Sequence, residues 1–334
     1  MIQIHVKKSL PKPGKAFSLY WKFAAERQHI FFSALGNDHV VTKDAILRTY
    51  KFTNAYRASD RVSQYLIRQV IYGDHFSLKD TFFRILLFKI FNRTETWKYL
   101  ERIMQRISWD YFHMEKYDQM LTDLKNEHKP LYSSAYMMAS GKSSFGSVLK
   151  HQNHLHLLQK MMKDQLYDKI AEAPALETVF HLLKGYPMMG NFLAFQFAID
   201  LNYSTIINFS EMDFVVAGPG ARSGIRKCFT DTGGYSEADI IKWMTDNQDE
   251  QFDKMGLTFK NLWGRKLQLI DCQNLFCEVD KYCRVAMPEL SVFPGRYKIK
   301  QKYRPAGEKI DYWYPPKWKI NDKIIVEPTS NQDL

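Results

Sequence analysis

The chain has 334 residues, of which 45% are hydrophobic and 25% charged, and its formal net charge at pH 7 is +11. This balance is typical of a globular protein and excludes a largely disordered chain. The positive charge suits a polyanionic partner, although solubility alone also explains it. The chain is also rich in aromatic residues, at 15%, and exposed rings can stack on nucleic-acid bases.

Neither a signal peptide nor a membrane span is predicted. Residues 1–8 contain no long apolar run. The most apolar stretch, residues 76–91, is interrupted by four charged side chains, whereas a span needs about 20 mostly apolar residues. We therefore expect a buried amphipathic helix there. The four cysteines form no CxxC pair, which predicts reduced thiols, no metal site and a cytoplasmic protein.

In chain order, the pattern predicts mostly helices. Residues 1–20 read as an extended lead-in, residues 21–287 as one helical unit of one or two lobes, and residues 288–334 as a basic, aromatic C-terminal arm. Within the unit, apolar residues at helical spacing and breaks at Gly and Pro predict several helices. Their expected ranges include 76–91, 147–170, 175–184, 191–201 and 265–286.

A small-residue loop, Ser140-Gly141-Lys142-Ser143, resembles the end of a phosphate-binding loop. The complete motif also needs a glycine at position 136, where this chain has Tyr, and a preceding strand. We therefore predict no ATP site and no cofactor.

The segment Gly218-Pro219-Gly220 precedes Arg222 and a short helix. This order is typical of the hairpin in a helix-hairpin-helix motif, where glycines let the backbone approach a DNA phosphate and the next helix N-terminus binds it. Arg226 and Lys227 would add positive charge. An ordinary turn between helices explains the same residues.

Asp280 is the first candidate for a catalytic carboxylate. Residues 279–284 loosely match a Val-Asp pattern downstream of the hairpin in helix-hairpin-helix DNA glycosylases, with Tyr282 at a His position. There a carboxylate stabilises the positive charge that develops on the sugar as the glycosidic bond breaks. A structural ion-pair network explains the same charges. Arg222 replaces the lysine of bifunctional enzymes, which predicts a monofunctional one.

Two further regions suit nucleic acid. Asn54 offers a donor and an acceptor for a base edge, and Arg57 and Arg61 follow at helical spacing, although a turn that caps a helix at Asp60 explains these residues as well. In residues 296–323, basic and aromatic side chains alternate, which suits phosphate contacts and stacking. A packed C-terminal arm is the alternative.

Taken together, several blocks of sequence resemble the helical domain associated with hydroxymethyluracil DNA kinases and with α-glutamyl/putrescinyl thymine pyrophosphorylases. The blocks follow one another in a consistent order along the chain. They are Glu26-Arg27-Gln28, Thr42-Lys43-Asp44, residues 52–57 with Asp60-Arg61, Ala135-Tyr136, residues 190–196 with Asp200-Leu201, residues 217–221 and residues 277–282.

This resemblance implies an all-α, DNA-glycosylase-like fold that is related to helix-hairpin-helix proteins and acts on hypermodified pyrimidines. We expect a monomeric, monofunctional DNA glycosylase that flips a base such as glucosylated hydroxymethylcytosine out of double-stranded phage DNA in anti-phage defence. The alternatives are an enzyme of base hypermodification, of the hydroxymethyluracil kinase or transferase type, and a non-catalytic reader of modified DNA.

The predicted site residues form three sets. The catalytic candidates are Asp280, Asp200 and Glu278. The substrate-binding candidates are Asn54, Arg57, Asp60, Arg61, Gln196, Lys281 and Tyr282. The DNA-binding candidates are Gly218, Pro219, Gly220, Arg222, Arg226, Lys227 and Arg284.

Overall fold

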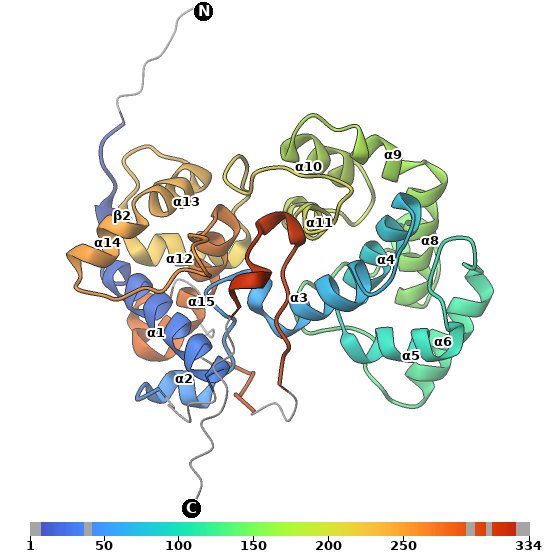
Figure 1. Cartoon of the computed structure of the whole chain (residues 1–334), viewed down its shortest axis with the longest axis horizontal. Helices are drawn as coiled ribbons and strands as arrows, with labels where there is room; N and C mark the ends of the chain where they lie inside the picture. Colours follow the sequence, from blue (N-terminus) through green and yellow to red (C-terminus); the bar gives the residue numbers. More distant parts are fainter. Residues whose placement is uncertain (1–7, 37–41, 292–297, 305–308, 325–334) are drawn as a thin grey trace, which may run out of the picture. The chain divides into compact units, whose positions relative to one another are not determined.

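The computed structural model of the chain describes residues 8–36, 42–291, 298–304 and 309–324. This part is mostly helical, which confirms the predicted all-α class (Figure 1). In it, strand is confined to a short antiparallel pair, β1 (Lys12–Pro13) and β2 (Phe229–Asp231). The contacts divide the chain into two compact units. Unit 1 comprises Met1–Asp60, Val215–Tyr312 and Pro316–Leu334, and unit 2 comprises Arg61–Phe214 and Trp313–Pro315.

Unit 1 is built from two long helices and several short ones. Its α-helices are α1 (Phe17–Leu35), α2 (Ala45–Thr49), α12 (Pro219–Cys228), α13 (Glu237–Asp246), α14 (Gln248–Lys254) and α15 (Leu269–Ala286). Its 3-10 turns are η1 (Arg57–Ser59), η3 (Pro288–Leu290), η4 (Pro316–Trp318) and η5 (Asn321–Lys323).

Unit 2 is a continuous succession of helices. They are α3 (Arg61–Tyr65), the π-helix η2 (Leu66–Ile71), α4 (Leu78–Phe91), α5 (Thr94–Met104), α6 (Met114–Asn126), α7 (Lys142–Phe145), α8 (Lys150–Lys163), α9 (Leu166–Ala171), α10 (Leu176–Lys184) and α11 (Asn191–Asn202).

The core of unit 1 is aromatic. Tyr20 of α1 packs against Phe276 of α15 with ring centroids 4.7 Å apart, and Trp21 packs edge-on against Phe252 of α14 at 5.0 Å. Rings of this size bury large apolar areas, and their tilted contacts add to the area term. The N-terminus of α1 therefore lies in the core, and the predicted lead-in ends at Phe17 rather than at residue 20.

Helix α12 lies unusually close to α15 because two glycines face it. A Cβ atom at Gly224 would lie 2.1 Å from the carbonyl oxygen of Phe276, and one at Gly220 would lie 3.1 Å from the Sγ of Cys277. Only glycine fits such an approach of two backbones. Gly220, one of the two glycines that the sequence assigns to a phosphate contact, thus lies at a helix–helix contact.

The helix-hairpin-helix detail is not confirmed. Gly218 is the N-cap of α12 and Pro219 is its first residue, so the Gly-Pro-Gly segment starts a helix instead of forming a separate turn. The preceding residues, 203–218, contain no helix or strand.

Helix α4 confirms the buried helix that is predicted for residues 76–91, but it is buried on all sides rather than amphipathic: every residue from Asp80 to Phe91 is buried. Its charged side chains have polar partners inside the protein, as burial requires. The carboxylate of Asp80 accepts hydrogen bonds from the Ser77 hydroxyl at 3.0 Å and from the Trp109 amide at 2.9 Å. Among the helices that the structure describes, none is long and apolar enough to cross a membrane.

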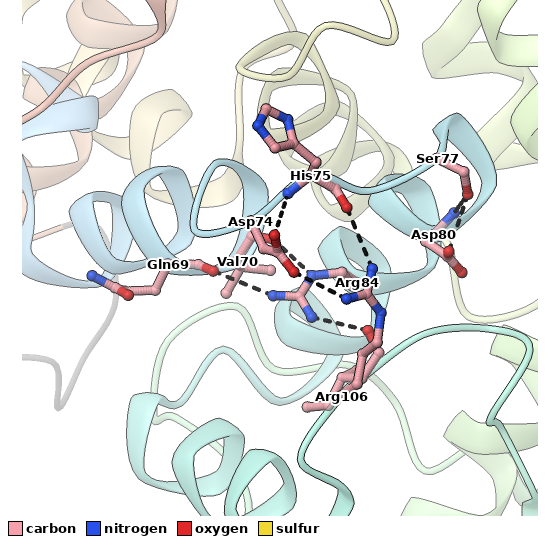
Figure 2. Close-up of polar contacts among 9 residues, drawn as sticks. Gln69, Val70, Asp74, His75, Ser77, Asp80, Arg84 and Arg106 are labelled. Carbon is pink, nitrogen blue, oxygen red and sulfur yellow. Dashed lines mark hydrogen bonds and ion pairs between the residues drawn. The ribbon is translucent and has the colours of Figure 1, made fainter.

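Arg84 of α4 uses backbone carbonyls as its partners (Figure 2). Its guanidinium donates to the carbonyl oxygens of Val70 and Ile107, each at 2.9 Å, and of Gln69 at 3.3 Å. The Phe76 ring lies 3.8 Å from the guanidinium carbon. Because the last carbonyls of a helix lack partners within it, Arg84 caps the C-terminus of η2. Burial lowers the pKa of Arg84 to about 10, so it remains charged at pH 7.

We predict that Gly224→Ala lowers the free energy of unfolding by about 1–3 kcal/mol, because the new methyl group overpacks the α12–α15 contact. This loss exceeds the gain of up to about 1 kcal/mol from the higher helix propensity of alanine. Urea denaturation measures the difference. The control is Gly185→Ala, where a Cβ would meet its nearest atom at 3.4 Å, an ordinary contact. Equal effects of the two substitutions would contradict the close approach.

Candidate functional site

A cleft of about 750 Å³ opens in unit 1 beside α1. Its wall is built from segments that are far apart in the sequence: α1, the start of α2, the loop of residues 256–260, and Tyr282 of α15. A volume of this size is typical of small-molecule sites. Three of the blocks that carry the family resemblance meet here, through Glu26, Lys43-Asp44 and Tyr282.

Two carboxylates in the cleft are held in place by hydrogen bonds. Asp44 is the N-cap of α2, and its Oδ1 accepts from the backbone amides of residues 46 and 47 at 2.8 and 3.0 Å. Its Oδ2 accepts from the Tyr282 hydroxyl at 2.5 Å. The Thr42 hydroxyl donates to Glu26. Burial, reinforced by Asp44, raises the pKa of Tyr282, which therefore stays a neutral donor. The carboxylate oxygens of Asp44 and Glu26 are thus held in place without a bound ligand.

The remaining polar wall is basic and partly aromatic. Lys22, His29, Lys43 and Lys260 are exposed at the cleft. The ammonium of Lys260 lies 4.2 Å from the centroid of the Phe32 ring. Nucleotide sites usually combine cations, which bind phosphate, with an aromatic ring, on which the base stacks. The cleft therefore has the chemistry to hold a nucleotide.

Asn54 follows the cleft residue Asp44 in the sequence and is fixed by hydrogen bonds inside the protein. Its Oδ1 accepts from Arg27 Nη2 at 2.9 Å, and its Nδ2 donates to the carbonyl oxygen of Ser59 at 2.8 Å. Arg27 Nε donates to the carbonyl oxygen of Thr53 at 2.9 Å. These bonds show that Asn54 holds the segment in shape, and its reading of a base edge stays a prediction.

Asp60, in the same segment, has an unusual pKa. Its Oδ1 accepts from the Asn54 backbone amide at 2.8 Å. Burial raises the pKa of Asp60 to about 7; the Asn54 amide and Arg27 oppose the rise, and the nearby charge of Glu278 adds to it. A half-buried carboxyl group that titrates near neutral pH is typical of functional sites, although structural networks also produce one.

Glu278 and Lys281 form an ion pair on α15 with an Nζ–Oε2 distance of 2.7 Å. Glu278 also accepts from the backbone amide of Thr53 at 2.9 Å, and Lys281 lies over the Phe52 ring at 4.5 Å. These contacts join α15 to the segment that carries Asn54. Glu278, Lys281 and Tyr282 therefore lie on one face of α15, in line with their spacing of three and four residues.

Arg57 is buried, with 2% of its surface exposed. Its backbone amide donates to Asp271 Oδ1 at 2.8 Å, and Asp271 is buried as well. This fixes η1 to the first turn of α15. A contact between Arg57 and substrate stays a prediction.

Asp280 lies on the opposite face of α15, toward α12. Its Oδ1 accepts from Lys227 at 2.8 Å and from the Ser223 hydroxyl at 2.5 Å, and its Oδ2 accepts from Arg284 at 2.8 Å. Burial alone would raise the pKa of Asp280, but these three partners outweigh it and hold the pKa below its ordinary value. The ion-pair alternative thus describes Asp280, and Lys227, 5% exposed, is not available for DNA.

Three of the predicted arginines are exposed: Arg61 in α3, and Arg222 and Arg226 in α12. Arg284 is half-buried beside Asp280. Contacts of Arg222 and Arg226 with DNA stay a prediction.

Unit 2 brings its own predicted residues together around Lys89. This lysine pairs with Asp200 at 2.8 Å, and both side chains are almost inaccessible. Its ammonium also lies 3.9 Å from the centroid of the Tyr136 ring, which stacks on Phe192 at 5.7 Å. Gln196 is fully buried on the same helix as Asp200. In the sequence, Lys89 is one of the four charged side chains that interrupt the apolar stretch of residues 76–91. A lysine inside a buried helix also indicates an acidic partner.

The sequence did not single out the basic side chains of the cleft, Lys22, His29 and Lys260, or the ring of Phe32. A lysine or an aromatic residue on a helix carries no signal of its own, because most such residues are solvated or packed. Only the fold brings residue 260 next to α1.

The phosphate-loop fragment does not fit a nucleoside triphosphate. Residues 134–141 contain no strand, and α7, which starts at Lys142, has four residues. The carbonyl oxygens of Ala139 and Ser140 accept from His154 and Asn153 at 2.8 and 3.0 Å. The loop is therefore tied to α8 by its backbone. In the part of the chain that the structure describes, no group of three or more His, Cys, Asp or Glu side chains could hold a metal ion.

The fold is all-α, and its unit 1 contains a basic, partly aromatic cleft with two positioned carboxylates. The family described as "5-hmdU DNA kinase, helical domain" matches residues 14–292. The chain belongs to this family, which confirms the resemblance seen in the sequence.

Among proteins of curated function, a 5-hmdU DNA kinase of Bacillus phage SP10 is 28% identical over 296 residues. The match covers 81% of this chain and 46% of the relative, so the chain spans about half the length of that relative. No solved structure matches.

The predicted DNA glycosylase is wrong. The family and the phage relative are named for a kinase, which transfers a phosphoryl group, and not for a hydrolase of the base–sugar bond. The hypermodification alternative is the one that these findings support. A catalytic role of Asp280, Asp200 or Glu278 in glycosidic cleavage falls with the glycosylase.

The substitution Asp60→Asn tests the raised pKa of Asp60. Because the pKa of Asp60 rises from 3.8 to about 7 on folding, the native state binds a proton that the unfolded state releases, and this contribution to stability is lost as the pH rises through that window. Relative to wild type, the variant should gain about 1–3 kcal/mol of unfolding free energy between about pH 4 and pH 7.

Urea denaturation at several pH values measures this gain. The asparagine side chain keeps an acceptor for the Asn54 amide, so the local bond survives. Asp249→Asn, at an exposed carboxylate of the same unit, is the control. Parallel stability curves for wild type and Asp60→Asn would show that Asp60 titrates normally.

Proposed function

We propose that this chain acts in the phosphorylation of 5-hydroxymethyl-2′-deoxyuridine in DNA, by binding the modified nucleotide and presenting its hydroxymethyl oxygen. The observation that carries the proposal is the meeting of Glu26, Lys43-Asp44 and Tyr282, all inside the family match, on one cleft of nucleotide size. The name of the phage relative supports the choice of modified base.

A base in a duplex is reached by flipping it out of the stack, and a flipped base needs a ring surface and hydrogen-bond partners. Phe32 would supply the ring, and Lys22, Lys43 and Lys260 would supply donors to phosphate and to the ring carbonyls. The carboxylates of Glu26 and Asp44 accept hydrogen bonds, which suits the N3–H and the hydroxymethyl O–H of this base. Cytosine offers an acceptor at N3 and would face these carboxylates unfavourably.

The donor side of the reaction is not part of this proposal. A magnesium-bound nucleoside triphosphate supplies the phosphoryl group in kinases. The fragment at Gly141-Lys142-Ser143 does not fit such a ligand, so we assign this chain the acceptor side only.

The test is a binding measurement with two duplexes of equal sequence, one with 5-hydroxymethyluracil and one with thymine at a single position. We expect the modified duplex to bind at least about tenfold more tightly, because a hydrogen bond to a charged group contributes about 1.5–3 kcal/mol. Asp44→Asn should remove most of this preference and still cap α2, since asparagine is as good an N-cap as aspartate.

Asp249→Asn, at a surface carboxylate, is the matched control and should keep the preference. Mass spectrometry of DNA incubated with the protein, without magnesium or nucleotide, shows whether any base is released. Equal binding of the two duplexes, or release of a free base without nucleotide, would overturn the proposal.

A further inference from the structure

Residues 298–304, Lys-Ile-Lys-Gln-Lys-Tyr-Arg, alternate basic and other side chains. In an extended chain, successive side chains point to opposite faces, so the basic ones share one face. In the structure Lys298, Lys300, Lys302 and Arg304 are all exposed. On the other face Ile299 is buried, at 7% exposed, whereas Gln301 and Tyr303 are exposed as well. The extended spacing places neighbouring charges about 6.6–6.8 Å apart, which is the scale of one nucleotide step.

This segment is held by backbone hydrogen bonds to residues 49–51. The amide of Lys51 donates to the carbonyl oxygen of Gln301 at 3.0 Å, and the amide of Tyr303 donates to that of Thr49 at 2.9 Å. Tyr50 and Lys302 form an antiparallel bridge between these bonds. The positions of the cations are therefore set by the backbone.

A groove of about 410 Å³ runs along this pairing, and Lys51, Lys300, Gln301, Lys302 and Arg304 line it. Four of these five side chains are cations, and among the residues that the structure describes no acidic one lines the groove. Within the described residues, none of the four cations belongs to an ion pair. Among the described aromatic residues of the predicted arm, Tyr314 is fully buried, whereas Tyr303 is 54% exposed.

We infer that this groove binds successive phosphates of the DNA strand that carries the modified base. The inference rests on the proposed function for the choice of DNA as the polyanion. Like charges held together by a fixed backbone repel one another, and a phosphate chain relieves this repulsion and releases counterions. Lys51, which lines the groove, lies two residues before Thr53, whose backbone is held by Glu278 and Arg27. Two residues of extended chain span about 7 Å, so the groove ends close to that segment.

The test is the salt dependence of DNA binding. Each phosphate contact adds about 0.9 to the slope of log K against log salt. The variant Lys300→Gln/Lys302→Gln/Arg304→Gln should therefore lower the slope by about 2–3 and weaken binding about tenfold or more in low salt. It should do so equally for modified and unmodified duplexes. Lys51→Gln, on the other segment, should lower the slope by about 1.

The control is Lys116→Gln/Lys125→Gln/Lys169→Gln, which removes the same charge from exposed positions of unit 2. Its slope should match wild type. An unchanged slope in the groove variant, or equal losses in groove variant and control, would overturn the inference. Thermal unfolding of both variants verifies that they are folded.

The outcomes separate this inference from the proposed function. If wild type does not prefer the modified duplex but the groove variant loses slope, the groove stands and the proposed substrate fails. If the preference is present but the slope is insensitive to the groove variant, the substrate stands and the groove fails.

Discussion

The buried carboxylate of Asp280 joins α12 to the long helix α15. Its partners are Lys227 and Ser223 of α12 and Arg284 of α15. A buried charge is tolerated only when hydrogen bonds and opposite charges replace its lost hydration. Here three donors fill its oxygens, and the glycines of α12 let the helices come close enough for those bonds to form. The orientation of α15 about its own axis follows from this contact.

That orientation decides what the other face of α15 can do. Glu278, Lys281 and Tyr282 point away from α12, toward the segment of residues 52–54 and toward Asp44. One helix thus has a structural face and a face directed at the candidate site. The cleft beside α1 and the basic groove at Lys51 both border elements that this second face contacts.

The sequence predicted well what depends on local pattern. The buried helix at residues 78–91 and the apolar helix at 191–202 follow from apolar periodicity, and the order of short motifs was specific enough for the family. The cleft could not be predicted, because Lys260 and Phe32 come together only through the packing of α1 against distant segments.

The reaction was misjudged for a different reason. A carboxylate in an apolar helix is equally compatible with catalysis and with a buried ion pair, and the partners that decide between them are a turn away or on another helix. For Asp280, Arg284 was visible at the i+4 position, but Lys227 and Ser223 were not. One fold can serve several reactions, so the resemblance seen in the sequence did not by itself select between a glycosylase and a kinase.

The division of α15 into two faces is tested most directly by comparing Asp280→Asn with Glu278→Gln, for stability and for preference between modified and unmodified duplex. We expect Asp280→Asn to lower the free energy of unfolding by about 3–5 kcal/mol, because it leaves buried cations without their partner, while the folded protein keeps its preference. Glu278→Gln should cost less stability and reduce the preference. A stable Asp280→Asn protein that has lost the preference would contradict this account and return Asp280 to the site.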